Sequence, residues 1–359
     1  MSEAFRNLLK QVGSGTHTSE ALTRDEAAQA TELMLRQVAT PAQIGAFMIA
    51  HRIRRPSAEE MAGLLDAYET LGPSLPPLAS GQPVLVLGNP FDGRSRTAPV
   101  APLIALLLSA AGCPVLMHGG RTMPTKYGVP LVDLWQSLGV DWTGLSLEAL
   151  GQVFARAQVG LVYLPRHFPL AEGLTQYREE LGKRPPLATL ELVWNAYGGR
   201  SRLAVGYVHP PTEERLMGTL ALRGCDDFIM VKGLEGSCDL PRDRTAIISV
   251  HRQGSATRLL LHPQDYGLGG KEVAYGTLAD WAAQAQTCLA GESGELEPAL
   301  LWSGGFYLWQ MELAPSLEAG IDRAKTLVRS GAVQAQLESL IQIWADDQSC
   351  HPEAVTLNL

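Results

Sequence analysis

The sequence predicts an α/β protein with a small N-terminal helical domain and a larger domain in which helices flank a mostly parallel sheet. Residues 1–75 carry the periodicity and capping signals of helices only. A proline- and glycine-rich connection follows at 72–83, which we interpret as a hinge. From there short apolar runs alternate with segments of helical length, an order typical of a parallel sheet covered on both faces. The second domain is therefore expected over 83–359.

The starts of three N-terminal helices are marked by their first residues. Thr23 precedes an amphipathic run and has Glu26 three residues later, which is the pattern of a capping box. Thr40 precedes Pro41, and proline is favoured at the first position of a helix. Ser57 begins the third helix in the same way as Thr23 begins the first.

The larger domain is expected to contain short apolar strands separated by helices. The strands are Val84–Leu87, Val115–Met117, Gly160–Leu164, Leu203–Val208, Phe228–Val231, Ala246–Val250 and Arg258–Leu261. Helices are expected between several of them, at 98–111, 128–138, 147–157 and 211–223. Two amphipathic helices, Ser316–Ser330 and Ala332–Trp344, are expected near the end of the chain.

One uncharged stretch, Ala98 to Met117, is long enough to raise the question of a membrane span. Three prolines and Gly112 interrupt it. We interpret it as a buried helix that runs into a buried strand, and we expect no membrane partner.

Composition indicates a globular, cytoplasmic protein. Hydrophobic residues make up 46% of the chain and charged residues 18%, a balance that argues against long disorder. The 5 cysteines are scattered, as expected for reduced thiols and not for a disulfide framework or a zinc site. The N-terminus lacks the apolar core of a signal peptide. The net charge of -8 disfavours nucleic-acid binding unless one face is locally basic.

Nearly the whole chain resembles one family. The segment 20–66, EALTRDEAAQATELMLRQVATPAQIGAFMIAHRIRRPSAEEMAGLLD, is similar to the N-terminal helical domain of anthranilate phosphoribosyltransferases, in which T-P-x-Q-I-x-A-F lies between two helices. The resemblance continues through 84–145, 159–185, 203–240 and 298–340. It implies a fold of the nucleoside phosphorylase/phosphoribosyltransferase type. A helical segment near 165–200 then returns to the small domain, and the active site lies between the two domains.

The resemblance also implies a reaction. Family enzymes join phosphoribosyl diphosphate to an aromatic amine and release diphosphate. The expected partners are phosphoribosyl diphosphate or another phosphate-bearing ligand, and the expected cofactor is Mg²⁺. No rival catalytic set competes, because no G-x-S-x-G turn and no zinc-ligand spacing is present. We assign no catalytic residue.

The first phosphate loop follows the first strand. Gly88, Asp92 and Gly93 match the outer positions of the family's G-T-G-G-D-G and are phosphate-binding candidates. Pro90 and Phe91 replace the two inner glycines. Proline removes an N–H donor, and a phenyl ring blocks the approach of a diphosphate to the backbone. These losses favour a structural strand-to-helix turn over a phosphate loop.

The second loop keeps more of the family pattern, H-G-N-R followed by S-V-S-S-K-x-G. The phosphate-binding candidates on it are Gly119, Arg121, Thr122, Thr125 and Lys126. Their hydroxyl and cationic groups could hold a phosphate through charge-assisted bonds. A solvated surface loop explains the same residues equally well.

The metal site is reduced. The segment 231–239 aligns with the family's V-H-G-x-D-G-L-D-E, and Cys238 replaces one carboxylate. Asp239 is the remaining metal candidate. A thiol is a poor ligand for Mg²⁺, which prefers oxygen, so tight Mg²⁺ binding is not expected. Glu235 could compensate only if it points into the site.

Four residues are candidates for binding the acceptor: His118, Gly120, His167 and Arg178. Arg178 lies in a Y-R-E-E-L-G run that resembles the family's V-R-x-E-L-G, whose arginine pairs with the anthranilate carboxylate. The alternative for Arg178 is a surface ion pair with a neighbouring glutamate, which contributes little energy.

Three functions stay open. The first is an anthranilate phosphoribosyltransferase-like protein with transfer weakened or lost. The second is a non-catalytic, homodimeric relative that binds single-stranded nucleic acid in a locally basic cleft, and the third is a scaffold without a ligand. The basic residues for the second are Arg94, Arg96, Arg121, Lys126, Arg166, Arg178, Lys183, Arg184, Arg200 and Arg202.

Two further expectations concern the aromatic residues near the cleft and the assembly of the chain. Trp194 and Tyr197 either pack inside the protein or offer stacking surfaces for bases. The homodimer is expected to form through an apolar face of the N-terminal helices that includes Ile44, Phe47, Met48, Leu64 and Leu65.

Overall fold

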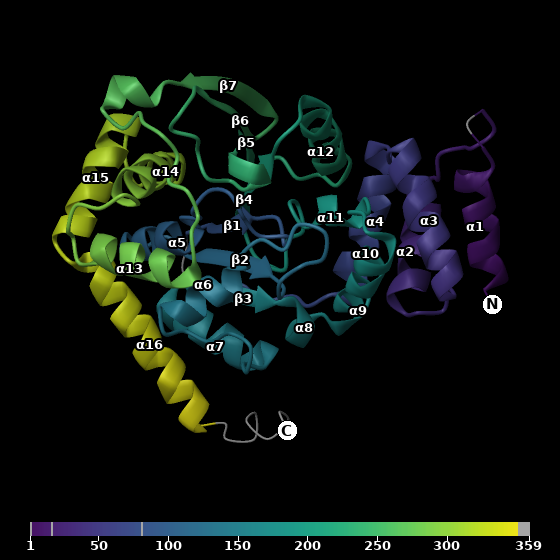
Figure 1. Cartoon of the computed structure of the whole chain (residues 1–359), viewed down its shortest axis with the longest axis horizontal. Helices are drawn as coiled ribbons and strands as arrows, with labels where there is room; N and C mark the ends of the chain where they lie inside the picture. Colours follow the sequence, from purple (N-terminus) through teal and green to yellow (C-terminus); the bar gives the residue numbers. More distant parts are fainter. Residues whose placement is uncertain (1, 16, 80–81, 351–359) are drawn as a thin grey trace.

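The protein has a helical domain at one end, a sheet in the middle and the C-terminal helices at the opposite end (Figure 1). The computed structural model describes residues 2–15, 17–79 and 82–350. The helical domain consists of α1 (Glu3–Gly13), α2 (Arg24–Leu35), α3 (Pro41–Arg54) and α4 (Ala58–Leu71).

The predicted helix starts are confirmed. The capping boxes pair Thr23 with Glu26 at α2 and Ser57 with Glu60 at α4, and Thr40 forms a third with Gln43 at α3. Each box satisfies backbone N–H groups that the first turn of a helix leaves unpaired.

The prediction that five apolar residues of the N-terminal helices form a dimer face is wrong. Ile44, Phe47, Met48, Leu64 and Leu65 are each at most 3% exposed within a single chain. They pack in the core of their own helical domain, so their apolar character reports intrachain burial. A homodimer would have to form through other residues.

The larger domain contains one seven-stranded sheet in the order β3-β2-β1-β4-β5-β6-β7. Its strands are β1 (Val84–Gly88), β2 (Val115–Gly119), β3 (Val159–Tyr163), β4 (Ser201–Tyr207), β5 (Phe228–Lys232), β6 (Ala246–Arg252) and β7 (Ser255–Leu261). The first five pair in parallel, and β6 and β7 extend the edge as an antiparallel hairpin. All seven predicted strands are therefore present, in the mostly parallel sheet that was expected.

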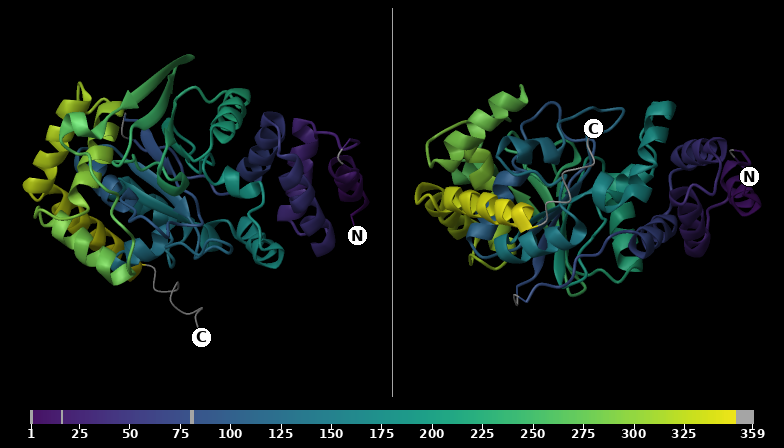
Figure 2. Two further views of the ribbon diagram at one scale, coloured as in Figure 1. Left: turned by 45° about the horizontal axis from the view of Figure 1, so that its top comes forward. Right: turned by 90° about the horizontal axis from the view of Figure 1, so that it is seen from below.

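Helices surround this sheet (Figure 2). They are α5 (Ala101–Ala110), α6 (Leu131–Ser137), α7 (Leu147–Ala157), α12 (Pro210–Leu222), α13 (Leu278–Leu289), α14 (Glu297–Gln310), α15 (Leu317–Arg329) and α16 (Ala332–Cys350). Helix α5 is buried along almost its whole length and leads into β2, as predicted for the uncharged stretch. Within the described residues, no helix has both the length and the apolar character needed to cross a membrane.

A chain of short helices connects the two domains. It contains α8 (Leu164–His167), α9 (Pro169–Glu172), α10 (Thr175–Leu181) and α11 (Leu187–Leu190). Helix α10 contacts α3, and α11 contacts α4. This segment therefore lies against the helical domain.

Candidate functional site

The candidate residues lie in loops at the carboxyl ends of parallel strands, where ligands bind in open α/β sheets. The loop after β1 and the loop after β2 are joined by backbone hydrogen bonds. Gly128 N–H donates to the carbonyl of Asp92 at 3.0 Å, and Val129 N–H donates to that of Arg94 at 2.9 Å. Gly93 has φ +68°, and a Cβ there would lie 2.1 Å from the Val129 carbonyl oxygen. The close approach of the two loops thus requires this glycine.

The first loop has become a closed, buried turn. Phe91 is 5% exposed, and its ring packs edge-on against His118 with 5.3 Å between ring centroids. Its N–H donates to the carboxylate of Glu191 at 3.0 Å. Asp92 is fully buried and ion-pairs with Arg178 and Arg184. Gly88 ends β1 beneath this turn. The Phe91 N–H group and the Asp92 carboxylate are therefore committed to partners within the protein.

Arg178 is the centre of a buried ion network. Its guanidinium pairs with Asp92 on one side and with Glu191, at 2.5 Å, on the other. The Arg178 side chain is 5% exposed, so the surface ion pair considered from the sequence is not what forms. Burial and the nearby Asp92 raise the pKa of Glu191, and Arg178 opposes that rise. The Nη1 and Nη2 groups are both occupied by carboxylates of the chain, and Nε is buried without a partner among the described residues.

The space beside Arg178 is almost filled. A cavity of only about 20 Å³ remains, lined by Tyr68, Phe91, Met123, Leu164, Leu174, Arg178, Leu187 and Glu191 among others. That volume is about enough for one water molecule. An aromatic acceptor would enter only after these side chains moved.

His118 is buried in a cage of aromatic rings. It lies between Phe91 and Trp194, whose ring centroids are 5.3 and 5.1 Å away. Neither of its ring nitrogens has a hydrogen-bond partner of normal geometry among the described residues. Burial lowers the pKa of His118 to about 4, with a smaller opposing contribution from the Trp194 backbone. His118 is therefore a neutral imidazole near pH 7.

The other acceptor candidates have structural partners. His167 Nδ1 accepts a hydrogen bond from Tyr163 N–H, and its Nε2 lies 2.9 Å from the Leu145 carbonyl oxygen. These contacts fix the corner where β3 passes into α8. Gly120 lies against Met123, whose methyl group would be 2.6 Å from an added Cβ.

The basic side chains of the second loop form ion pairs with carboxylates of the chain. Arg121 pairs with Glu172 at 2.9 Å, and Lys126 pairs with Glu235 at 3.0 Å and donates to the Gly93 carbonyl. Thr125 has φ +81°. Its hydroxyl is buried without a partner among the described residues, at the edge of the interdomain pocket. Gly119 ends β2, and Thr122 lies in a shallow surface hollow beside α10.

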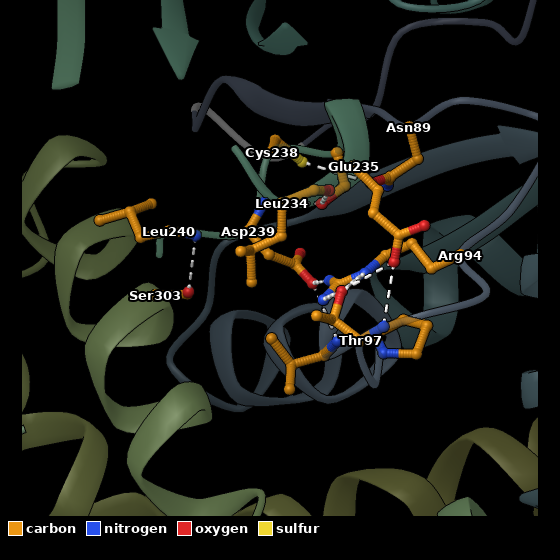
Figure 3. Close-up of polar contacts among 12 residues, drawn as sticks. Asn89, Arg94, Thr97, Leu234, Glu235, Cys238, Asp239, Leu240 and Ser303 are labelled. Atoms are coloured by element: carbon orange, nitrogen blue, oxygen red, sulfur yellow. Dashed lines mark hydrogen bonds and ion pairs between the residues drawn. The ribbon is translucent and has the colours of Figure 1, made fainter. Parts of the chain in front are cut away.

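Asp239 and Glu235 face the first loop instead of an open metal position (Figure 3). Asp239 accepts from the Arg94 guanidinium and, at 3.0 Å, from Val100 N–H. Glu235 accepts from the N–H groups of Arg96 and Thr97 at 3.0 Å. Although burial opposes it, these bonds and Lys126 lower the pKa of Glu235 to about 2.

These residues do not fit Mg²⁺. The Cys238 thiol is fully buried, donates weakly to Asn89 Oδ1 at 3.6 Å, and has a pKa raised by burial. Asp239 already holds a guanidinium, and within the described ranges no group of three or more potential ligands comes together. A magnesium ion would have to displace Arg94 and Lys126 from their carboxylates.

Sequence reasoning missed Glu191 as a member of this site, and it expected Arg94 only as a cation of a basic cleft and not as the buried partner of Asp239. Glu191 carried a signal, because it is the single charged residue within residues 185–199 and a lone charge in an apolar run needs a buried partner. Arg94 carried none, since its partner Asp239 lies 145 residues away.

The basic residues expected to form a channel are mostly neutralised. Arg94, Arg96, Arg121, Lys126, Arg178, Arg184 and Arg202 each pair with an aspartate or glutamate. Trp194 is 3% exposed and Tyr197 is 7% exposed, so they pack inside the protein and offer no surface for bases.

A large pocket opens between the two domains. Its volume is about 1060 Å³. It is lined by the end of α3 and the residues after it, by residues between 182 and 192 and by the start of α12, together with Pro90, Thr125 and Glu235. It adjoins the two loops, because Pro90 and Thr125 are among its lining residues.

Known proteins share this architecture. The helical bundle domain of a glycosyl transferase family matches residues 6–72, and the α/β domain of that family matches residues 93–334. An anthranilate phosphoribosyltransferase from Azorhizobium caulinodans is 28% identical over 341 residues, covering 94% of this chain and 96% of its own. The Sinorhizobium medicae enzyme of that name is 29% identical over 329 residues, covering 90% and 95%.

Solved structures agree on the fold. Anthranilate phosphoribosyltransferase from Thermus thermophilus superposes with a TM-score of 0.78 at 20% identity, covering 96% of this chain and 100% of its own. The Saccharomyces cerevisiae enzyme in complex with PRPP and Mg gives 0.83 at 17% identity, covering 96% and 99%. From its two matched domains, the chain belongs to the glycosyl transferase family that includes the anthranilate phosphoribosyltransferases.

Proposed function

We propose that this chain is an anthranilate phosphoribosyltransferase-like protein in which Mg²⁺-dependent transfer to an aromatic amine is strongly weakened or lost. The observation that carries this proposal is the pairing of Arg178 with both Asp92 and Glu191. Because two carboxylates already pair with this buried guanidinium, their negative charges oppose the binding of an acceptor carboxylate beside it. Removing such a pair's partner is costly, so the substrate would have to displace a stable arrangement.

The donor side supports the same proposal. Pro90 supplies no N–H, and the N–H of Phe91 is taken by Glu191. Asp239 and Glu235 hold Arg94 and Lys126. A cation of the protein is therefore paired with the remaining metal candidate, Asp239, and another is paired with Glu235, the carboxylate that could have compensated for Cys238.

The test measures phosphoribosyl transfer directly. The purified protein is incubated with phosphoribosyl diphosphate, Mg²⁺ and anthranilate, and loss of anthranilate fluorescence is followed. We expect no turnover above the background without protein. Steady product formation would overturn the proposal.

A gain-of-function variant sharpens this test. The substitutions Pro90→Gly, Phe91→Gly and Cys238→Asp return the family's residue types to the two motifs. Donor binding, measured calorimetrically with Mg²⁺, should be stronger in this variant than in the wild type, provided that its circular dichroism shows a folded protein. The matched surface variant Pro315→Gly should leave donor binding unchanged.

Nucleic-acid binding is the second candidate function, and one observation favours it. The rim of the interdomain pocket carries Arg52, Arg55, Lys183 and Arg215 without carboxylate partners among the described residues. Arg121, Lys126 and Arg178, the residues first expected to make these contacts, are committed to Glu172, Glu235 and Asp92. Binding to a single-stranded oligonucleotide should therefore depend on the rim, and it should weaken steeply with salt. Binding that is unaffected by salt would exclude this function.

A homodimer and a cytoplasmic location complete the proposal. Sedimentation at micromolar concentration should give about twice the mass of one 38.7 kDa chain. A mass close to that of a single chain would contradict the dimer.

A further inference from the structure

We propose that Arg24, Asp66, Glu69 and Arg223 form an ionic latch that holds the helical domain against the α/β domain and that opens as salt concentration rises. Asp66 and Glu69 lie on α4, and Arg223 reaches them from the C-terminal end of α12. None of the four residues lines the interdomain pocket or the cavity beside Arg178. The inference is therefore independent of whether transfer activity has been lost.

Two arginines share the carboxylate of Asp66. Arg24, at the start of α2, contacts both of its oxygens, with Nε 2.5 Å from Oδ2 and Nη2 2.9 Å from Oδ1. Arg223 also pairs with Asp66 and extends the network to Glu69. Asp66 thus joins a cation of its own domain to a cation of the other domain. The two arginines balance the two carboxylates in charge, so the closed network needs no bound ion.

Each domain also provides an arginine to the backbone of the other. Arg24 Nη1 donates to the carbonyl of Leu222, the last residue of α12, at 2.9 Å. The last carbonyl groups of a helix have no partner within the helix and carry partial negative charge, which a cation stabilises. Arg223 Nη1 in turn lies 3.4 Å from the Ala62 carbonyl oxygen on α4. The helical domain therefore supplies part of the C-terminal cap of α12, and α12 loses this part when the latch opens.

Beside the latch, small residues of the two helices meet. Gly218 of α12 lies against Ala58 of α4, where an added Cβ would be 3.0 Å from the Ala58 Cβ. The Thr219 hydroxyl is 3.4 Å from the Ala58 carbonyl oxygen, and it donates at 2.8 Å within its own helix to the carbonyl of Arg215. Small side chains bury little apolar area, so these contacts add little to the association of the helices. The attachment of α12 to α4 at this end therefore depends on the ion pairs.

A second attachment of α4 has a different chemistry. The Tyr68 ring packs edge-on against Phe168, with 5.2 Å between ring centroids, and lies 6.3 Å from the Trp194 ring. The three residues are at most 8% exposed. Salt does not screen such apolar contacts, whereas it screens charges that water reaches. The Arg24 and Asp66 side chains are 38% and 29% exposed, so the latch weakens as salt rises while the aromatic attachment persists.

Opening of the latch is therefore expected to be a local event. The C-terminal turn of α12 separates from α4, while both domains stay folded and stay joined at Tyr68. Ion pairs of this exposure contribute little each, so the open state should be populated enough for hydrogen exchange to detect it.

The test is hydrogen exchange followed by mass spectrometry at about 20 mM and about 500 mM NaCl, between which the screening length falls from about 20 Å to about 4 Å. In the wild type, the amides of residues 218–224 should exchange about fivefold faster at the higher salt concentration. Arg223→Gln keeps the pair between Arg24 and Asp66 but removes the ion pairs between the domains, so its α12 amides should exchange at the faster rate at both concentrations. The amides of β4 should not change in either protein, because the sheet stays folded.

The matched control is Arg36→Gln, which removes an arginine that pairs with Glu32 inside the helical domain. Its α12 amides should exchange like those of the wild type at both salt concentrations. The proposal fails if exchange in α12 of the wild type does not depend on salt, or if Arg36→Gln accelerates it as much as Arg223→Gln does. It also fails if the β4 amides of Arg223→Gln exchange faster together with those of α12, because the substitution would then destabilise the whole fold and not open a latch.

Discussion

The guanidinium of Arg94 ion-pairs with the carboxylate of Asp239, and both side chains are almost completely buried. In sequence the two residues belong to different motifs, the first loop and the reduced metal segment. In the structure they form one contact that joins the loop after β1 to the loop after β5 (Figure 3). The first loop and the metal segment, which the family resemblance implied would contact a ligand, therefore contact each other.

Breaking this pair should be strongly destabilising. Arg94→Met leaves Asp239 buried with only Val100 N–H as a donor, and loss of one partner of a buried pair costs about 3–5 kcal/mol. Urea unfolding followed by circular dichroism measures the change. The control Arg244→Met removes an exposed partner of Asp243 and should cost less than about 1 kcal/mol. Equal effects of the two substitutions would mean that the Arg94–Asp239 pair contributes no more than a surface ion pair.

His118 should make the protein sensitive to mild acid. Its pKa of about 4 in the folded state lies below the ordinary value of 6.5, so the unfolded chain takes up the proton first as the pH falls. Stability from the neutral imidazole is therefore complete above pH 6.5 and decreases towards pH 4. Between pH 7 and 4.5 the loss should be about 2–3 kcal/mol. In His118→Phe this part of the pH dependence should disappear, which unfolding curves at the two pH values can check. An unchanged difference between the two curves would show that another group is responsible.

Glu191→Gln should partly free Arg178. The substitution keeps the size of the side chain but removes one of the two negative charges on the guanidinium. Calorimetric titration with anthranilate should show no binding to the wild type and weak, saturable binding to the variant. The control Glu180→Gln lies on the same helix as Arg178 and is exposed, so it should behave like the wild type. No gain of binding in Glu191→Gln would show that the filled cavity, and not the charge, excludes the acceptor.

Magnesium should leave the stability of the protein unchanged. The carboxylates of Asp239 and Glu235 already hold Arg94 and Lys126, so a divalent cation gains no vacant ligands. Melting temperatures in millimolar MgCl₂ and in EDTA should agree within experimental error. An increase that saturates with MgCl₂ would reveal a metal site that the two carboxylates can open to form.

The framework of the fold could be predicted from local patterns. The capping boxes at Thr23 and Ser57 and the apolar runs of the sheet depend on residues a few positions apart, which the sequence shows directly. Prediction failed where a residue packs against a partner that is distant in the sequence. Helix α5 was recognisable as buried, whereas the burial of Ile44 and Phe47 in their own domain looked from the sequence like a dimer face.

The site was harder to predict because charge compensation is a long-range property. Arg121, Lys126 and Arg178 were expected around one cleft as unpaired cations. In the structure they pair with Glu172, Glu235 and Glu191, respectively. The spacing of residues in the sequence does not show where these glutamate side chains point. Arg55 and Arg215 gave no motif at all. Neither arginine has a carboxylate partner among the described residues, and this becomes visible only when the pocket is assembled from both domains.

The attachment of α12 to α4 has a mechanical consequence. The helix is 13 residues long, or about 20 Å, and it is fastened to the helical domain at its C-terminal end through Arg223. If the two domains rotated relative to each other, α12 would pivot about the ion pair between Arg223 and Asp66. A rotation of about 5° at this ion pair moves the opposite end by about 2 Å, which is enough to make or break a hydrogen bond. The displacement caused by a small change in domain angle would consequently increase from the C-terminal end of α12 towards Arg215 and the pocket. The C-terminal end, which Arg223 holds, would barely move.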